Sequence, residues 1–252
     1  MTAPAPLPPQ DAARVARRAL PLLDLTDLSD ACTAAAVAEL CGKARASGVA
    51  AVCVWPRFVA DSVRALEGSG VRVATVINFP EGGEDAERAV ADTSASLADG
   101  ADEIDLVLPY PALMRGDAGT ARGMVAAVRE ACAGRLLKVI LETGRLEAPD
   151  LIARASRLSL EAGADFIKTS TGKTPVSATP AAAESMLNVI RARGDRSAGL
   201  KVSGGLRRVE DAGAYLALAD RIMGTDWASP NTFRIGASAL HADLVRALEA
   251  AP

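Results

Sequence analysis

Residues 103–109 read EIDLVLP, and the alternation in this stretch guides the interpretation of the whole chain. Ile104, Leu106 and Leu108 form one apolar set, whereas Glu103 and Asp105 fall on the opposite face. Such alternation indicates a β-strand, because successive side chains of a strand point to opposite faces. The stretch therefore predicts a strand with one aliphatic side and one charged side.

Two other stretches repeat this division. Lys138 in LLKVILE (136–142) and Lys201 in GLKVSG (199–204) each lie opposite an aliphatic set. We expect the aliphatic sets to face surrounding helices and the polar sets to face the inside of a closed barrel. Charges enclosed in one space are costly and are seldom kept without a use. The predicted interior is therefore the first candidate for a functional site.

Short apolar runs alternate with longer segments of helical period along the chain. Strands are predicted at 20–26, 51–55, 72–78, 103–109, 136–142, 165–170, 199–204 and 221–224. Helices are predicted near 33–46, 57–67, 84–99, 118–133, 149–162, 179–193, 208–219 and 237–249. Eight such units predict an α/β protein with a single (β/α)₈ barrel. We expect a Pro-rich leader and short N-terminal helix over 1–19, followed by the catalytic barrel over 20–252.

The composition excludes several classes of protein. The 28 basic and 31 acidic side chains give a net charge of −3, which argues against a nucleic-acid-binding surface. Charges interrupt every apolar run, so we expect no membrane partner, and the N-terminus lacks the pattern of a signal peptide. The four cysteines, Cys32, Cys41, Cys53 and Cys132, lack paired spacing. We expect free thiols in a reducing cytoplasm. The sequence leaves a homodimer open.

Lysine is rare in this chain, with five lysines against 23 arginines. Lys138, Lys168 and Lys201 fall in three consecutive predicted strands, and Lys173 follows the second of them. An amine can lose its proton and attack a carbonyl, whereas a guanidinium stays charged. Paired interior charges, or strand-end lysines that reach solvent, are the alternative. Three such lysines favour amine chemistry, in which a second cation lowers the pKa of the nucleophile, and Lys168 and Lys201 could form this pair.

Asp105 has the carboxylate needed to shuttle protons at the substrate. The alternative is a structural salt bridge to one of the lysines, and both roles could hold at once. The only histidine, His241, falls in the last predicted helix, and no cluster of side chains has the spacing of metal ligands. We therefore expect no metal ion.

Glycine-rich loops follow the last strands, in the segments STGK (170–173), SGGLR (203–207) and IGAS (235–238). Glycine lets backbone N–H groups approach an anion, and barrels of this class commonly bind phosphate at these loops. We expect Gly236 and Ser238 to open the last helix. Ordinary turn formation would also explain the glycines.

At the residue level the chain resembles the deoxyribose-phosphate aldolases, which are class I aldolases that form a Schiff base. The matching segments are LLDLTDLSD (22–30), AAVCVWPRF (50–58), ATVINFPEG (74–82), GADEIDLVLPYPALMRG (100–116), LLKVILETG (136–144), GADFIKTSTGK (163–173), GLKVSGGLR (199–207) and RIGASAL (234–240). The resemblance implies a (β/α)₈ barrel and reversible cleavage of 2-deoxy-D-ribose 5-phosphate to acetaldehyde and D-glyceraldehyde 3-phosphate. It implies small phosphosugar and aldehyde substrates, no cofactor, and a place in nucleoside catabolism.

The resemblance also assigns roles to residues. It implies that Lys168 forms the Schiff base, that Lys201 lowers the pKa of that lysine, and that Asp105 relays protons. It implies substrate contacts at Asp24, Thr171 and Lys173. Phosphate contacts are implied at Gly172, Lys173, Gly204, Gly205, Gly236 and Ser238.

Two features depart from the family pattern. Ala239 stands where many members have a second serine, which removes one hydroxyl that could bind phosphate. Some members end in a tyrosine that assists proton transfer, whereas this sequence ends in LEAAP. Solvent would then take over that step, or turnover would be slower.

Two rival functions stay open at this point. One is a different Schiff-base lyase or transferase that acts on another phosphosugar. The other is a barrel that binds phosphosugars without catalysis.

Overall fold

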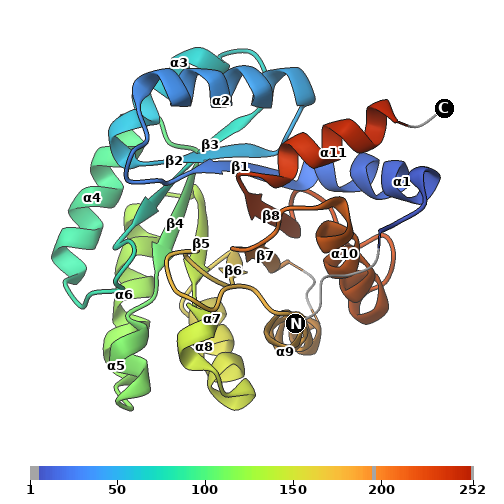
Figure 1. Ribbon diagram of the computed structural model, residues 1–252. Helices are drawn as coiled ribbons and strands as arrows, with labels where there is room; N and C mark the ends of the chain where they lie inside the picture. The colour runs from blue at the N-terminus through green and yellow to red at the C-terminus, as the bar shows by residue number, and fades with distance from the viewer. Residues whose placement is uncertain (1–5, 195–196, 251–252) are drawn as a thin grey trace.

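The structure is a computed structural model that describes residues 6–194 and 197–250, and its strands close into a barrel (Figure 1). The strands are β1 (Leu23–Asp27), β2 (Ala51–Val54), β3 (Arg72–Ile77), β4 (Glu103–Val107), β5 (Leu136–Ile140), β6 (Phe166–Lys168), β7 (Gly199–Ser203) and β8 (Phe233–Ala237). Each strand pairs in parallel with the next, and β8 pairs with β1. The predicted (β/α)₈ class is therefore confirmed.

Helices surround the barrel on its outside (Figure 1). The helices between and after the strands are α2 (Ala34–Ser47), α3 (Val59–Leu66), α4 (Ala86–Ala98), α5 (Tyr110–Met114), α6 (Ala118–Ala131), α7 (Thr143–Leu146), α8 (Pro149–Glu161), α9 (Pro180–Arg193), α10 (Val209–Met223) and α11 (Leu240–Glu249). The short helices α5 and α7 are not in the sequence-based prediction. Neither are the 3₁₀ turns η1 (Leu20–Leu22) and η2 (Pro56–Phe58).

Local sequence explains where the longer helices begin and end. The Oγ1 atom of Thr33 accepts a hydrogen bond from the N–H of Ala36, which caps the start of α2. Gly48 ends that helix with a φ of 61°, a left-handed conformation that glycine adopts without strain. Thr179 and Gly194 bound α9 in the same way.

The predicted eighth strand is wrong. Residues 221–223 form the end of α10 and Gly224 caps it, whereas β8 is Phe233–Ala237. A four-residue apolar run does not distinguish a strand from a buried turn of helix. The true strand contains Arg234, whose charge hides the apolar pattern in the sequence. The last helix starts at Leu240 and not at residue 237, because residue 237 is the last residue of β8.

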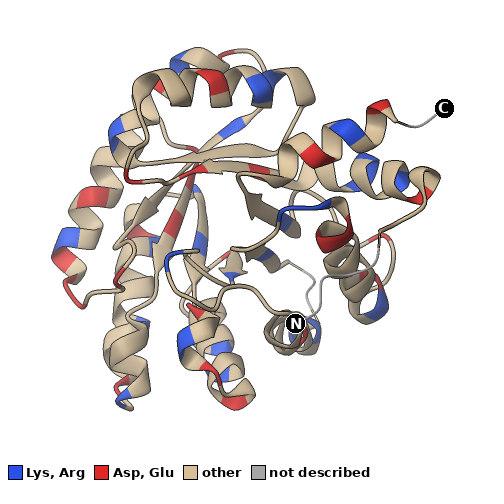
Figure 2. Cartoon of the chain, viewed as in Figure 1, with Lys and Arg blue, Asp and Glu red and all other residues tan. Residues whose placement is uncertain are grey.

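The two faces of the strands separate as the alternation predicts. Ile104 and Leu106 are buried in the large apolar core shared by strands and helices, whereas Glu103 and Asp105 of the same strand are buried among charged groups from other strands. Figure 2 shows charged positions on the strands inside the ring of helices as well as on the helices themselves. This confirms a polar interior in the barrel.

Helix α1 (Pro9–Ala19) precedes the barrel and packs against α10 and α11 (Figure 1). Ala13, Ala16 and Ala19 form its buried face. The guanidinium of Arg18 donates two hydrogen bonds of 2.8 Å to the carboxylate of Asp220 on α10. The confirmed fold thus includes an N-terminal helix, while residues 1–5 of the expected leader and residues 251–252 of the expected barrel lie outside the described part.

Candidate active site

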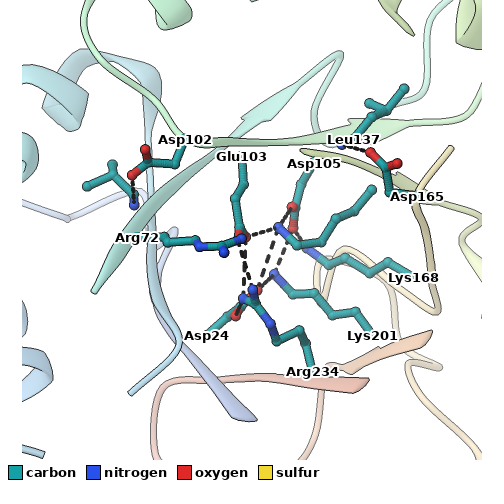
Figure 3. Close-up of polar contacts among 12 residues, drawn as sticks. Asp24, Arg72, Asp102, Glu103, Asp105, Leu137, Asp165, Lys168, Lys201 and Arg234 are labelled. Atoms are coloured by element: carbon teal, nitrogen blue, oxygen red, sulfur yellow. Dashed lines mark hydrogen bonds and ion pairs between the residues drawn. The ribbon is translucent and has the colours of Figure 1, made fainter. Parts of the chain in front are cut away.

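A network of charged side chains occupies the barrel interior, contributed by six of the eight strands (Figure 3). Its members are Asp24 of β1, Glu103 and Asp105 of β4, Lys138 of β5, Lys168 of β6, Lys201 of β7 and Arg234 of β8. Each is at most 3% exposed. Burial of seven ionisable side chains is tolerated only when they compensate one another.

Asp105 is the centre of this network. Its Oδ1 atom accepts a hydrogen bond from Nζ of Lys138 at 2.7 Å. Its Oδ2 atom accepts from Nζ of Lys168 and from Nζ of Lys201, each at 2.8 Å. The structure therefore brings together the three residues for which the sequence suggests catalytic roles. The structural salt bridge, which was the alternative interpretation of Asp105, is also present, because the same carboxylate is an ion-pair partner of all three lysines.

A second layer of carboxylates lies beside Asp105. Nζ of Lys138 is 2.6 Å from Oε2 of Glu103, and Nζ of Lys201 is 2.6 Å from Oδ2 of Asp24. Arg234 joins the two carboxylates, with Nη1 2.6 Å from Oδ1 of Asp24 and Nη2 2.8 Å from Oε1 of Glu103. Lys168 contacts neither carboxylate of this layer, so its only ion-pair partner among the described residues is Asp105.

Because their ion-pair partners differ, Lys168 and Lys201 have pKa values that are shifted in opposite directions. Burial lowers the pKa of Lys168, and the nearby charge of Lys201 lowers it further, although Asp105 opposes both effects. Burial also disfavours the charged form of Lys201, but Asp105 and Asp24 outweigh it and raise its pKa. Burial acts to raise the pKa of Asp105, but the three lysines outweigh it and hold that pKa well below the ordinary value. The geometry therefore favours a reactive amine at Lys168 beside a cationic Lys201 and an anionic Asp105.

A cavity of about 490 Å³ opens at the ends of the strands above this network. Of the three interior lysines only Lys168 lines it, together with the loops after β1, β6, β7 and β8. A somewhat larger cavity of about 560 Å³ lies along α4, but none of the network residues line it. The smaller cavity is therefore the candidate active site, since a small molecule bound there would meet the Lys168 amine.

The predicted phosphate residues surround the same cavity. Gly172, Gly204 and Gly205 line it with φ angles of 80°, 90° and 88°, conformations that L side chains rarely adopt. Ser238 lies exposed at the rim. These positions supply the small residues that a backbone anion site requires.

Two expectations about the loop after β8 are wrong. Gly236 lies within β8 and Ser238 in the turn before α11, so neither is the first residue of the last helix. Gly236 has a different role, because a Cβ at this position would lie 2.9 Å from Cβ of Ser203 and 3.0 Å from Cε of Lys201. The missing side chain makes room for the interior lysine.

The three predicted substrate residues differ in position. Thr171 lines the cavity, and its hydroxyl donates a short hydrogen bond to the buried carboxylate of Glu142. Nζ of Lys173 lies at the rim, 2.8 Å from Oδ1 of Asp30. Asp24 is fully buried within the charged network and does not line the cavity.

Sequence reasoning missed Arg234. The misplaced eighth strand left this residue outside the predicted interior. The signal that could have found it is the alternation in FRIGA (233–237), where Phe233 and Ile235 lie opposite Arg234 and Gly236.

The described part of the chain holds neither a cluster of metal ligands nor a membrane-spanning helix. Within residues 6–194 and 197–250, no group of three or more His, Cys, Asp or Glu side chains is placed to hold a metal ion. His241 is buried in α11, with Nε2 2.8 Å from Oγ of Ser47. No helix in the described part of the chain has the length and apolar character needed to cross a membrane.

Comparison with known proteins gives a family match over most of the chain. Residues 18–243 match the DeoC/LacD family of aldolases. A candidate deoxyribose-phosphate aldolase from Coccidioides immitis is 32% identical, with a TM-score of 0.81 over 97% of this chain and 88% of that one. A candidate deoxyribose-phosphate aldolase from Toxoplasma gondii is 26% identical, with a TM-score of 0.89 over 96% of this chain and 99% of that one.

A third structure supports the fold alone. Deoxyribose phosphate aldolase from Aeropyrum pernix, described as a tetramer, is 24% identical, with a TM-score of 0.77 over 95% of this chain and 97% of that one.

Proposed function

The chain belongs to the DeoC/LacD family of aldolases and is a carbon–carbon lyase, and from this premise we propose that its substrate is 2-deoxy-D-ribose 5-phosphate. The enzyme cleaves this sugar reversibly to acetaldehyde and D-glyceraldehyde 3-phosphate. The observation that carries the proposal is the position of Lys168, which alone among the interior lysines lines the cavity and lacks a carboxylate of its own.

In the cleavage direction the neutral amine of Lys168 attacks the C1 aldehyde of the open-chain sugar. Loss of water gives a protonated imine, which withdraws electrons from the adjacent C2–C3 bond. That bond breaks as Asp105, directly or through water, accepts the proton of the C3 hydroxyl. C3 becomes the aldehyde carbon of glyceraldehyde 3-phosphate, and C1 and C2 remain as an enamine on Lys168. Protonation of C2 and addition of water then release acetaldehyde and restore the amine.

Lys201 stays protonated throughout this cycle. Its two carboxylate partners, Asp24 and Asp105, hold the charge in place, and that charge favours the neutral form of the neighbouring Lys168. A guanidinium at position 168 could not perform the reaction because it does not lose its proton.

The glycine loops and the cation at the rim account for recognition of the 5-phosphate. Backbone N–H groups of Gly172, Gly204, Gly205, Gly236 and Ser238 are the proposed donors, with the ammonium of Lys173 as a counter-ion. The hydroxyl of Thr171 is the proposed direct partner of a sugar hydroxyl. Asp24 does not line the cavity, so its proposed role in substrate binding is indirect, through its contact with Lys201.

The proposed setting is a reducing cytoplasm, which is consistent with four cysteines that are all buried and unpaired. The substrates are small phosphosugars and aldehydes. The proposed site residues all come from one chain, and a homodimer would be detected by light scattering of the purified protein.

Borohydride trapping tests the proposal. The protein is incubated with deoxyribose 5-phosphate and sodium borohydride, digested, and mapped by mass spectrometry. We expect a reduced adduct on Lys168, and none in Lys168→Arg, whose turnover should fall by about four orders of magnitude. A Lys168→Arg variant with wild-type turnover would refute the assignment of the nucleophile.

The same experiment separates the rival functions. Binding of the phosphosugar with no adduct on any lysine would indicate a barrel that binds without catalysis. An adduct on Lys168 without release of acetaldehyde would indicate a Schiff-base enzyme for another phosphosugar.

A further inference from the structure

Arg234 is the second residue of β8, with 1% of its surface exposed. Its guanidinium donates to Oδ1 of Asp24 at 2.6 Å and to Oε1 of Glu103 at 2.8 Å, and Nε donates to the backbone oxygen of Pro230 at 2.5 Å. A planar guanidinium held by two carboxylates and a carbonyl has one fixed orientation. Arg234 is therefore built into the barrel, away from the cavity that holds the substrate.

The charges of the network show what Arg234 does there. Three carboxylates, Asp24, Glu103 and Asp105, face four basic groups, Lys138, Lys168, Lys201 and Arg234. The network is electrically balanced only when one basic group is neutral. A balanced interior is favoured because an uncompensated buried charge is costly.

The contacts identify which group is neutral. Arginine does not lose its proton in proteins. Lys138 and Lys201 each bind two carboxylates at 2.8 Å or less. Lys168 has only Oδ2 of Asp105, which it shares with Lys201. It is therefore the basic group that loses least when its proton leaves.

The other groups near the network do not alter this balance. Cys53 on β2 is a buried thiol whose pKa burial raises, so it is uncharged. Strand β3 contributes only Arg72, which is 3.3 Å from Glu103 but has a side chain that is 46% exposed. Lys173 at the rim is paired with Asp30. Water screens the charges of Arg72 and Lys173, whereas it does not reach Arg234.

We propose that Arg234 is a positioning residue that keeps the amine of Lys168 unprotonated. Asp24 and Glu103 would otherwise favour the protonated form of Lys168, and Arg234 supplies the balancing positive charge in its place. This inference rests on the proposed role of Lys168 as the Schiff-base nucleophile. Arg234 would favour the neutral form of Lys168, as Lys201 does, although it contacts neither the substrate cavity nor Lys168.

The sign of the effect can be tested in both directions. Arg234→Met removes a positive charge, so Lys168 should hold its proton to a pH higher by about one unit. Glu103→Gln removes a negative charge and should lower that pH. Arg234→Lys keeps the charge and should stay near the wild type. The double variant Arg234→Met with Glu103→Gln restores the balance and should also return towards the wild type.

Two readouts measure this pH. Competitive acetylation with trace acetic anhydride, mapped to the Lys168 peptide by mass spectrometry, reports the ionisation of the amine without any turnover. The acid limb of kcat/KM for deoxyribose 5-phosphate reports it during catalysis. On the acid limb, below the pH at which half of Lys168 is neutral, a shift of one unit corresponds to about a tenfold loss of kcat/KM in Arg234→Met.

Arg72→Met is the matched control, because it removes an arginine from the same carboxylate at the solvent-exposed side. This variant should change neither the acetylation midpoint of Lys168 nor the acid limb of kcat/KM. Equal midpoints in the wild type, Arg234→Met and Glu103→Gln would overturn the proposal. If Arg234→Met does not fold, Glu103→Gln and the double variant still decide it. Failure of the proposed function would appear differently, as a wild type whose Lys168 is acetylated normally but forms no borohydride-trapped adduct.

Discussion

Lys168 and Lys201 are partners in the register of β6 and β7, and their Nζ atoms each lie 2.8 Å from the same oxygen, Oδ2 of Asp105. The two amines differ in their remaining surroundings. Lys201 has Asp24 as a second counter-ion and is fully buried, whereas Lys168 has no second counter-ion among the described residues and lines the cavity. One shared carboxylate therefore connects Lys201 to Lys168, the proposed nucleophile.

Lys201→Leu should move the acid limb of kcat/KM to higher pH. Loss of the neighbouring positive charge raises the pKa of Lys168, so less of the amine is neutral at pH 7. We expect a shift of about one to two pH units, and a loss of about tenfold or more in kcat/KM on the acid limb. Lys201→Arg, which keeps the charge, should shift less. If the maximal kcat/KM falls while the pH of the acid limb stays the same, this role of Lys201 is contradicted.

Asp105→Asn should separate imine formation from bond cleavage. Asp105 raises the pKa of Lys168, so without it the amine stays neutral and still traps substrate. The proton acceptor for the C3 hydroxyl is lost, and kcat should fall by about 10²–10⁴. Borohydride trapping and steady-state turnover of the same sample measure the two steps. Asp102→Asn, a change to a partly exposed carboxylate outside the network, is the control. Parallel loss of adduct and turnover would argue against the relay role.

Ser238→Asp should weaken phosphate recognition selectively. Ser238 lies exposed at the cavity rim, so an added carboxylate would repel the 5-phosphate without disturbing the buried network. We expect KM for deoxyribose 5-phosphate to rise by about tenfold or more, with little change for unphosphorylated deoxyribose. Ser238→Asn introduces a side chain of similar size without the charge and should have a smaller effect. Equal effects on the two sugars would place the phosphate elsewhere.

The protein should lose stability steeply in acid. Despite their burial, Asp24, Glu103 and Asp105 have lowered pKa values because the lysines and Arg234 stabilise their charged forms. Their contribution is complete above the unfolded pKa values of about 4 and is lost as pH falls towards the folded values. Each carboxylate adds up to about 1.4 kcal/mol per pH unit to the slope of the free energy of unfolding.

Denaturant unfolding between neutral pH and pH 2 measures this slope. Glu103→Gln should make it shallower, whereas Asp61→Asn, a change to an exposed carboxylate on α3, should leave it unchanged. A free energy of unfolding that does not vary below pH 4 would show that the network carboxylates are not charged in the native state.

Local pattern accounts for most of the fold. Short apolar runs predict seven of the eight strands. Alternation predicts the side of β4, β5 and β7 that faces inward, because the direction of a side chain in a strand depends only on its place in the alternation. The lysine positions pointed to amine chemistry, because only an amine can deprotonate and attack a carbonyl.

The pairing of the charges depended on barrel closure. Asp24 and Arg234 lie at opposite ends of the sequence and meet only because β8 pairs with β1. No local pattern tells which interior lysine borders the cavity, since all three share the inward face of their strands. That distinction follows from the depth of each residue along the barrel and from the carboxylates that neighbouring strands bring to it, and both are properties of the tertiary structure.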